Sequence, residues 1–126
     1  MTGNEYQELA TRTNDGNHSI RLLNIAYSDV VSNCNIPEAI NACLGLSGET
    51  GELLDMIKKW IFHEKELDMD HAQKELGDVM WYVAMFCHAM GWKLDDILKK
   101  NIEKLKARYP QGFDVQLSAN RKEGDL

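Results

Sequence analysis

Apolar side chains recur at the spacing of an α-helix along most of this chain, and that pattern leaves little room for another fold. They keep a period of about 3.6 residues over 37–63, 70–90 and 94–109. Residues 4–13 and 20–31 form two shorter helix candidates. The 126 residues include two prolines and are 44% hydrophobic, so the sequence predicts an all-α protein with a buried core.

Capping residues set the expected ends of the longer helices. Pro37 suits the first turn of the helix that it opens, and Gly91 stands where the next helix should stop. Asp70 is the expected N-cap of that second long helix, with Gln73 completing a capping-box pattern. These signals place a charged connection between the two longest helices.

The chain is expected to form one domain over residues 1–113, followed by a polar, flexible tail over 114–126. Beyond residue 113 the apolar period ends, and polar residues predominate. The four main helices predict a fold that resembles a four-helix bundle.

Three glycines, Gly45, Gly48 and Gly51, recur every third residue inside the first long helix. Each costs about 1 kcal/mol relative to alanine in a helix interior, so their presence needs a reason. Their spacing places them along one side, where another backbone or a ligand could come close. A phosphate-binding loop is the competing interpretation, but no Gly-Lys-Ser/Thr follows and no strand precedes.

Charge and composition exclude several classes of protein. The formal net charge is −6, from 14 basic and 20 acidic residues, so no duplex nucleic-acid partner is expected. No run approaches the roughly 18 apolar residues of a membrane span, and the start of the chain carries no apolar signal core. Cys34, Cys43 and Cys87 lack metal-finger spacing and are expected to be reduced thiols of a cytoplasmic protein.

Two carboxylate pairs carry the chemistry that the sequence predicts. Glu49-x-x-Glu52 lies within the first long helix and Glu75-x-x-Asp78 within the second, and residues three apart share a helix face. An antiparallel pairing of these helices would gather all four carboxylates beside apolar neighbours. Gathered anions lose hydration at a cost of several kcal/mol per ion, which divalent cations would offset.

The donor chemistry indicates the metal. All-oxygen ligation suits Mg²⁺, with Mn²⁺ as an alternative, rather than zinc. A di-iron centre is not expected, because neither motif has the Glu-x-x-His pattern. The competing interpretation is that these acids are solvated and pair with nearby lysines.

Three stretches resemble the MazG-like nucleoside triphosphate pyrophosphohydrolases of the all-alpha pyrophosphatase superfamily: GLSGETGELLDMIKK, KELGDVMWYVAMF and NIEKLKARYPQGF. The resemblance runs from about residue 44 to residue 113. It implies Mg²⁺-dependent hydrolysis of a (deoxy)nucleoside triphosphate to the monophosphate and pyrophosphate. It also implies that the four carboxylates hold the metal, and that Glu49 or Glu52 acts on the attacking water. A homo-dimer or homo-tetramer, preferably a tetramer, is implied as well.

The same resemblance assigns substrate contacts to the last long helix. Asn101, Lys104 and Arg108 share one face and match positions where the family places ligand-contacting residues. Lys104 and Arg108 are expected to meet phosphate oxygens, and Asn101 the sugar or base. The competing interpretation is a solvated basic face near a helix C-terminus.

Three further residues are candidate substrate contacts. Tyr82 lies one turn after Asp78, Trp60 could stack on the base, and Lys59 could help to hold phosphate. Three of the four histidines receive no role, because the sequence reveals no partner for them: His63, His71 and His88.

Two other functions remain open at this stage. The chain could be a hydrolase of the same fold that cleaves a non-standard phosphorylated substrate, or a helical binding module without catalysis. The resemblance does not align residues 14–36 or the tail, so the preferred base and sugar are not predicted.

Overall fold

A computed structural model describes residues 1–27 and 33–125 of the chain. Its helices are α1 (Gly3–Thr11), α2 (His18–Ala26), α3 (Ile36–Phe62), α4 (Met69–Met90), α5 (Leu94–Arg108) and α6 (Val115–Ala119). The described residues form no β-strand, and the predicted all-α class is confirmed. None of their helices is both long and apolar enough to cross a membrane.

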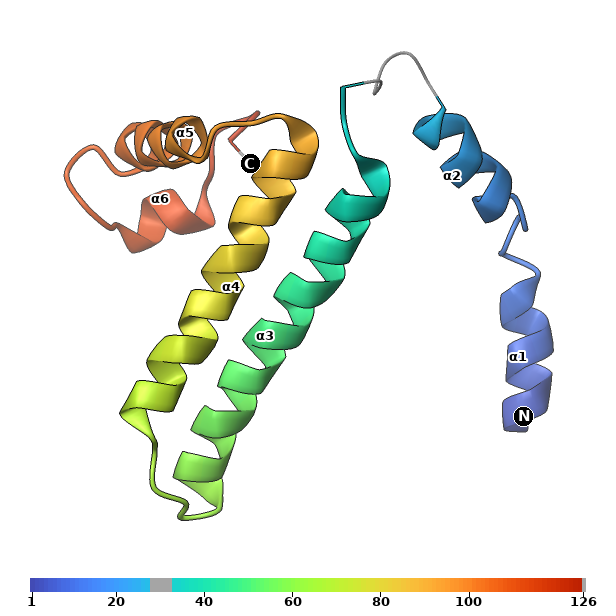
Figure 1. Cartoon of the computed structure of the whole chain (residues 1–126), viewed down its shortest axis with the longest axis horizontal. Coiled ribbons are helices and arrows are strands. Elements are labelled where there is room, and N and C mark those ends of the chain that lie inside the picture. The colour runs from blue at the N-terminus through green and yellow to red at the C-terminus, as the bar shows by residue number, and fades with distance from the viewer. Residues whose placement is uncertain (28–32, 126) are drawn as a thin grey trace.

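An antiparallel hairpin of α3 and α4 forms the centre of the molecule (Figure 1). Small side chains are buried in this hairpin: Ala39, Ala42, Cys87 and Ala89. A Cβ atom on Gly45 would lie 2.1 Å from a ring carbon of Tyr82, so only glycine admits the ring at that point. The close neighbour at Gly45 is thus a side-chain ring, where the sequence analysis expected a backbone or a ligand.

The ends of the hairpin follow the expected capping signals at two positions. Asn35 accepts a hydrogen bond from the backbone N–H of Glu38 at 3.2 Å, and Pro37 lies in the first turn of α3. Gly91 ends α4 in the left-handed conformation, with φ of 70°. Both helices begin and end within a residue of the predicted positions.

The predicted N-cap of α4 was wrong. Asp68, not Asp70, has the extended backbone of a cap, and its carboxylate accepts from the backbone N–H of His71 at 3.0 Å. Asp70 already lies in the first turn, where it pairs with Lys74 four residues on. The predicted pattern with Gln73 fails because the helix begins before Asp70.

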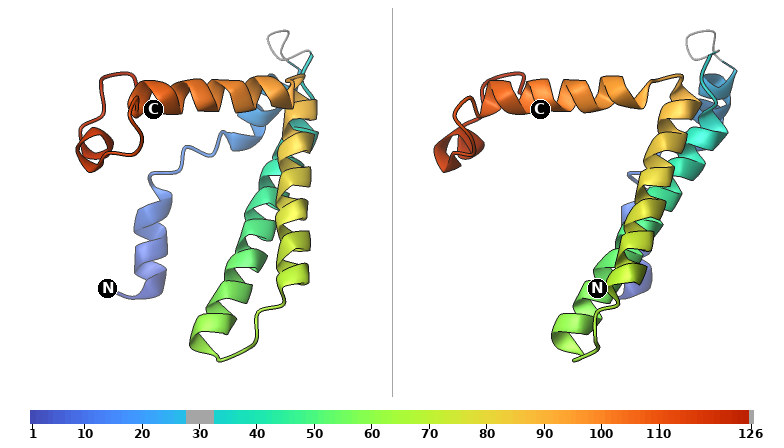
Figure 2. Two further views of the ribbon diagram at one scale, coloured as in Figure 1. Left: turned by 90° about the vertical axis from the view of Figure 1, so that its left-hand side faces the viewer. Right: turned by 60° about the vertical axis from the view of Figure 1, so that its left-hand side comes forward.

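The remaining helices do not pack along the hairpin as α3 and α4 pack on each other. Figure 2 shows α5 turning away from the end of α4, and α6 lying beside α5. The helix predicted over 20–31 spans His18–Ala26 in the structure, and positions 28–31 of that prediction lie outside the described residues. The segment 114–126 contains α6, and the flexibility expected of it stays a prediction.

One chain leaves much apolar surface uncovered. Leu54 of α3 is 68% exposed and Leu76 of α4 is 52% exposed, while α5 exposes Leu98 and Ile102 to a similar degree. Monomeric proteins seldom expose contiguous apolar surface on this scale. The described part of one chain therefore does not complete a four-helix bundle by itself. The predicted dimer or tetramer stays a prediction, which this exposed surface supports.

The turn after α3 contains a strained residue. Glu64 has φ of 53°, a left-handed conformation that glycine adopts at little cost. It lies between His63 and Lys65, whose backbone N–H groups both donate to the carbonyl of Lys59, at 3.0 and 3.2 Å. Replacing Glu64 with glycine should raise the free energy of unfolding by about 0.5–1 kcal/mol, as measured by urea denaturation at a fixed protein concentration.

Gly91→Ala is the matched control, because Gly91 occupies the same left-handed region at the end of α4. It should lower the free energy of unfolding by about 1 kcal/mol, the opposite sign. A Glu64→Gly protein no more stable than the wild type would show that the turn is not strained.

Candidate active site

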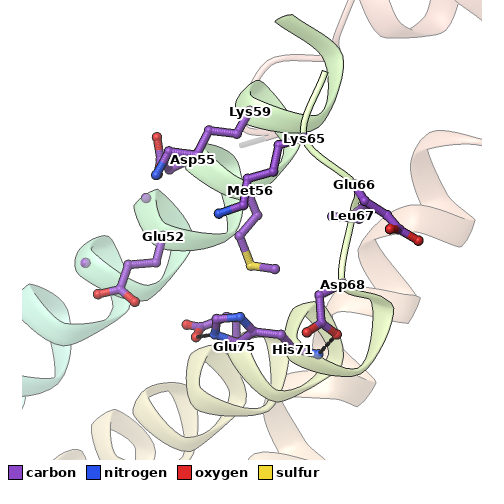
Figure 3. Close-up of a pocket in the computed structure, with 12 residues that line it drawn as sticks. Glu52, Asp55, Met56, Lys59, Lys65, Glu66, Leu67, Asp68, His71 and Glu75 are labelled. Carbon is purple, nitrogen blue, oxygen red and sulfur yellow. Dashed lines mark hydrogen bonds and ion pairs between the residues drawn. The ribbon is translucent and has the colours of Figure 1, made fainter. Parts of the chain in front are cut away.

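Three carboxylates converge in the middle of the hairpin. Glu49 and Glu52 lie one turn apart on α3, Glu75 lies on α4, and each offers an oxygen within 4.8 Å of the others. Figure 3 shows Glu52 and Glu75 facing each other from the two helices. The structure thus brings together three of the four side chains predicted to hold metal, because the two helices run antiparallel at close range.

Glu75 is the buried member of this cluster, with 9% of its surface exposed. Its Oε1 atom lies 2.7 Å from Nε2 of His71, one turn earlier on α4. Its other oxygen, Oε2, is buried and has no hydrogen-bond partner among the described residues. Buried charges are normally paired or bound to a metal, so this oxygen needs a cation or a proton.

The cluster perturbs Glu49. Loss of hydration raises the pKa of the Glu49 carboxyl above its ordinary value. The negative charges of Glu52, Asp78 and Glu75 raise this pKa further. The side chain therefore holds a proton to higher pH than a solvated glutamate does.

Asp78 is exposed and does not belong to the group whose oxygens lie within 4.8 Å of one another. Its charge nevertheless contributes to the raised pKa of Glu49, which indicates that it lies near the cluster. Its role as a fourth metal ligand stays a prediction.

The three converging side chains fit a divalent cation. They supply only oxygen donors, and one of those oxygens is buried without a partner. Two oxygens each about 2.1 Å from Mg²⁺ lie at most about 4.2 Å apart, so the 4.8 Å limit requires only a small contraction. Zinc sites, by contrast, usually include histidine or cysteine ligands.

A pocket of about 580 Å³ extends from the cluster toward the connection between α3 and α4. Glu52 and Glu75 line one part of the pocket, and Gly48 and Gly51 line it on the side of α3. These two glycines have no side chain, and the space beside them is open. Lys59, a predicted substrate contact, also lines this pocket and pairs with Asp55 at 2.5 Å.

Several pocket residues were not predicted by the sequence analysis, among them two that carry a basic or imidazole group. His71 lies four residues before Glu75, and this helical spacing was a signal that could have indicated the pair. Lys65 comes from the connection after α3, where no periodic pattern predicts which way a side chain points.

The aromatic candidates lie elsewhere. Tyr82 packs against Gly45 in the hairpin contact, and its ring meets Trp81 edge-on at 4.9 Å between centroids. Trp60 is 49% exposed. Neither Trp60 nor Tyr82 is among the residues that line the pocket beside the carboxylates.

The polar candidates on α5 are not brought to the carboxylates within one chain, because α5 turns away from the hairpin (Figure 2). Asn101 is exposed, and Lys104 and Arg108 line a separate pocket of about 340 Å³ beside the C-terminal segment. Their roles in substrate binding stay predictions.

Arg108 holds a carboxylate of its own chain. Its Nε atom donates to Oδ2 of Asp125 at 2.7 Å, and its Nη2 atom donates to Oδ1 at 2.5 Å. This two-pronged contact holds the pKa of the Asp125 carboxyl below its usual range, and the charges of Arg121 and Lys104 add to the effect. A planar fork of this kind also matches phosphate oxygens.

The fold and the site together define an all-helical protein with a cluster of three carboxylates on a helical hairpin. The model of the MazG nucleotide pyrophosphohydrolase domain matches residues 38–113, and the chain belongs to this family. The chain is also similar to the Gene 37 protein of Mycobacterium phage L5, with 33% identity over 113 residues. That alignment covers 81% of this chain and 98% of the phage protein. No solved structure matches the chain significantly.

The family match confirms the resemblance noted from the sequence. It covers the hairpin and α5, and therefore every residue predicted to hold metal or substrate. It begins after α2, so the first two helices lie outside it.

Repulsion within the cluster gives a test on metal-free protein. Glu49→Gln removes one negative charge from the carboxylate cluster and so reduces the repulsion among its members. It should therefore raise the midpoint of thermal unfolding, measured in EDTA at neutral pH. Glu103→Gln is the matched control: it removes the same charge from an exposed side chain of α5 and should leave the midpoint nearly unchanged. A lowered midpoint for Glu49→Gln would show that the cluster does not repel.

The sign of the pH dependence follows from the raised pKa. A proton on Glu49 stabilises the folded state, fully below the unfolded pKa of about 4.3 and less as pH rises through the folded pKa. The stabilisation by Glu49→Gln should therefore be small at low pH and grow through this window. Thermal unfolding of the wild type and of Glu49→Gln across this pH range measures the difference between their midpoints. A difference that does not change with pH would contradict the raised pKa of Glu49.

Proposed function

We propose that this protein is a Mg²⁺-dependent pyrophosphohydrolase that converts a (deoxy)nucleoside triphosphate to the monophosphate and pyrophosphate. The observation that carries the proposal is that Glu75, whose Oε2 is buried without a hydrogen-bond partner among the described residues, converges with Glu49 and Glu52 beside a pocket. Membership of the MazG family supports the reaction class. Mn²⁺ could replace Mg²⁺ at oxygen donors of this kind.

Glu49, Glu52 and Glu75 would hold the cation, with Asp78 as the fourth ligand that the family resemblance implies. When bound, Mg²⁺ would neutralise phosphate charge and lower the pKa of a water molecule. Glu49 or Glu52 would orient the attacking water and accept its proton as the water oxygen bonds to phosphorus. The bond between the α and β phosphates breaks, and pyrophosphate leaves.

Substrate binding is proposed to use two sets of residues. Lys59 lines the pocket beside the carboxylates, and Trp60 and Tyr82 are the proposed aromatic contacts of the nucleotide. On α5, Lys104 and Arg108 would bind phosphate oxygens.

The basic residues of α5 would meet the carboxylates in an assembly rather than within one chain. Asn101 is proposed to contact sugar or base from the same helix face as Lys104 and Arg108. We propose a homo-dimer or homo-tetramer in which α5 of one copy approaches the hairpin of another. The exposed apolar side chains of α3, α4 and α5 support such packing.

Turnover with a panel of ribo- and deoxyribonucleoside triphosphates tests the proposed function. With Mg²⁺ present, we expect monophosphate and pyrophosphate from at least one substrate, and no product in EDTA. Glu52→Gln should lower the rate by about 100-fold or more, because a ligand of the cation is lost. The Glu103→Gln control should keep wild-type activity.

Circular dichroism would establish that each variant keeps its helical fold. Unchanged activity in folded Glu52→Gln would refute the role of the cluster in catalysis. Absence of turnover for every triphosphate, with folded protein and metal, would favour a non-standard phosphorylated substrate or a binding module.

The pair between Arg108 and Asp125 gives a second test. If Arg108 binds phosphate, the substrate must displace Asp125, so Asp125→Asn should lower KM. We expect a fall of about tenfold, because the side chains of this pair are only 10% and 20% exposed and hydrogen bonds between charged groups are stronger than those between neutral groups. The value of kcat should be unchanged. Glu123→Gln is the matched control, since it removes the same charge from the same segment without touching this pair. An equal fall of KM in both variants would indicate a general charge effect.

A further inference from the structure

His71 holds the carboxylate that is most deeply buried in the cluster. Its Nε2 atom lies 2.7 Å from Oε1 of Glu75, and Figure 3 shows the ring beside that carboxylate. An ionised carboxylate can only accept hydrogen bonds, so Nε2 carries the hydrogen and donates it. The contact joins two residues one turn apart on α4.

The burial of Glu75 distinguishes this pair from ion pairs on the exposed surface of a helix. The Glu75 side chain is 12% exposed, and its second oxygen is buried without a partner among the described residues. With Oε1 bound to His71, Oε2 is the oxygen left for the cluster. Fixing one oxygen therefore fixes the direction in which the other points.

Two lysines near Glu75 pair with other carboxylates. Lys74, next to Glu75 in the chain, pairs with Asp70 at 2.5 Å. Lys59, across the pocket, pairs with Asp55 at 2.5 Å. His71 is thus the donor that the described structure gives to Glu75.

His71 is itself held in place at the start of α4. Its backbone N–H donates to the carboxylate of Asp68, the N-cap, at 3.0 Å. The cap fixes the first turn of the helix, and the first turn sets the position of the imidazole. A continuous set of hydrogen bonds therefore links the end of the connection to Glu75.

We propose that His71 is a positioning residue: by donating from Nε2 to Oε1 of Glu75, it directs Oε2 toward the cation shared with Glu49 and Glu52. This inference rests on the proposed metal site. His71 acts through Glu75 and touches no reacting atom. Partners of this kind orient metal ligands elsewhere, and their loss typically costs 10–100-fold in metal affinity.

Direct Mn²⁺ binding to the full-length protein, followed by the free-ion signal in electron paramagnetic resonance, tests the inference. His71→Leu should raise the Kd for Mn²⁺ about tenfold or more. His71→Gln places an amide N–H near the position of Nε2, so it should bind Mn²⁺ within about threefold of the wild type. His88→Leu, the control, removes an exposed histidine from the other end of α4 and should leave Kd unchanged.

His71→Asn keeps an amide on a shorter side chain that cannot reach Oε1, so it should bind as weakly as His71→Leu. This variant keeps the comparison decisive if His71→Leu fails to fold. At saturating Mg²⁺ the nucleotide KM should stay near that of the wild type, while the Mg²⁺ concentration needed for half-maximal rate rises.

Three outcomes would overturn the inference. If His71→Leu or His71→Asn bound Mn²⁺ with wild-type affinity, the inference would be refuted. The proposed function would remain intact, provided the wild type binds Mn²⁺ and hydrolyses a nucleotide. Equal weakening in His71→Gln and His71→Asn would show that the hydrogen bond is not the cause. Failure of the wild type to bind Mn²⁺ at all would remove both the inference and the metal site on which it rests.

Discussion

The close antiparallel contact of α3 and α4 is the constraint on which the rest of this structure depends. It is possible because the facing positions carry small side chains, and because Gly45 leaves room for the ring of Tyr82. That contact brings Glu75 within reach of Glu49 and Glu52. A larger side chain at Gly45 would have to displace the ring or separate the helices. The geometry of the candidate site therefore depends directly on how closely the two helices of the hairpin pack.

Gathering carboxylates at a partly buried place has an electrostatic consequence. The pKa of Glu49 is raised by lost hydration and by its acidic neighbours, and one oxygen of Glu75 has no partner in the described structure. In the absence of a cation the cluster is destabilised by its own charge. The same features suit the cluster to binding a divalent cation. A cation there would serve the nucleotide chemistry of the pyrophosphohydrolase family to which the chain belongs.

The other half of the predicted substrate site is organised separately. Arg108 contacts Asp125 of its own chain, and α5 extends away from the hairpin, so the basic and acidic groups are not brought together in one copy. The apolar side chains that this arrangement leaves exposed would be available for contacts in the proposed assembly. Function in this protein is therefore proposed to depend on association as much as on the fold of the single chain.

The sequence by itself determined the helical class and, within a residue, the limits of α3, α4 and α5, because helical periodicity and capping are local. It predicted that Glu49, Glu52 and Glu75 would converge only if α3 and α4 paired antiparallel, and the tertiary structure provides that pairing. Only the tertiary structure decided that Asp68 caps α4 and that His71 binds Glu75. It also decided that Arg108 of α5 pairs with Asp125 of the C-terminal segment. The cap depends on where the connection before α4 ends, and the Arg108–Asp125 pair joins residues that no periodic pattern relates. The spacing of His71 and Glu75 is present in the sequence, but the burial of Glu75 comes from the packing of α3 on α4.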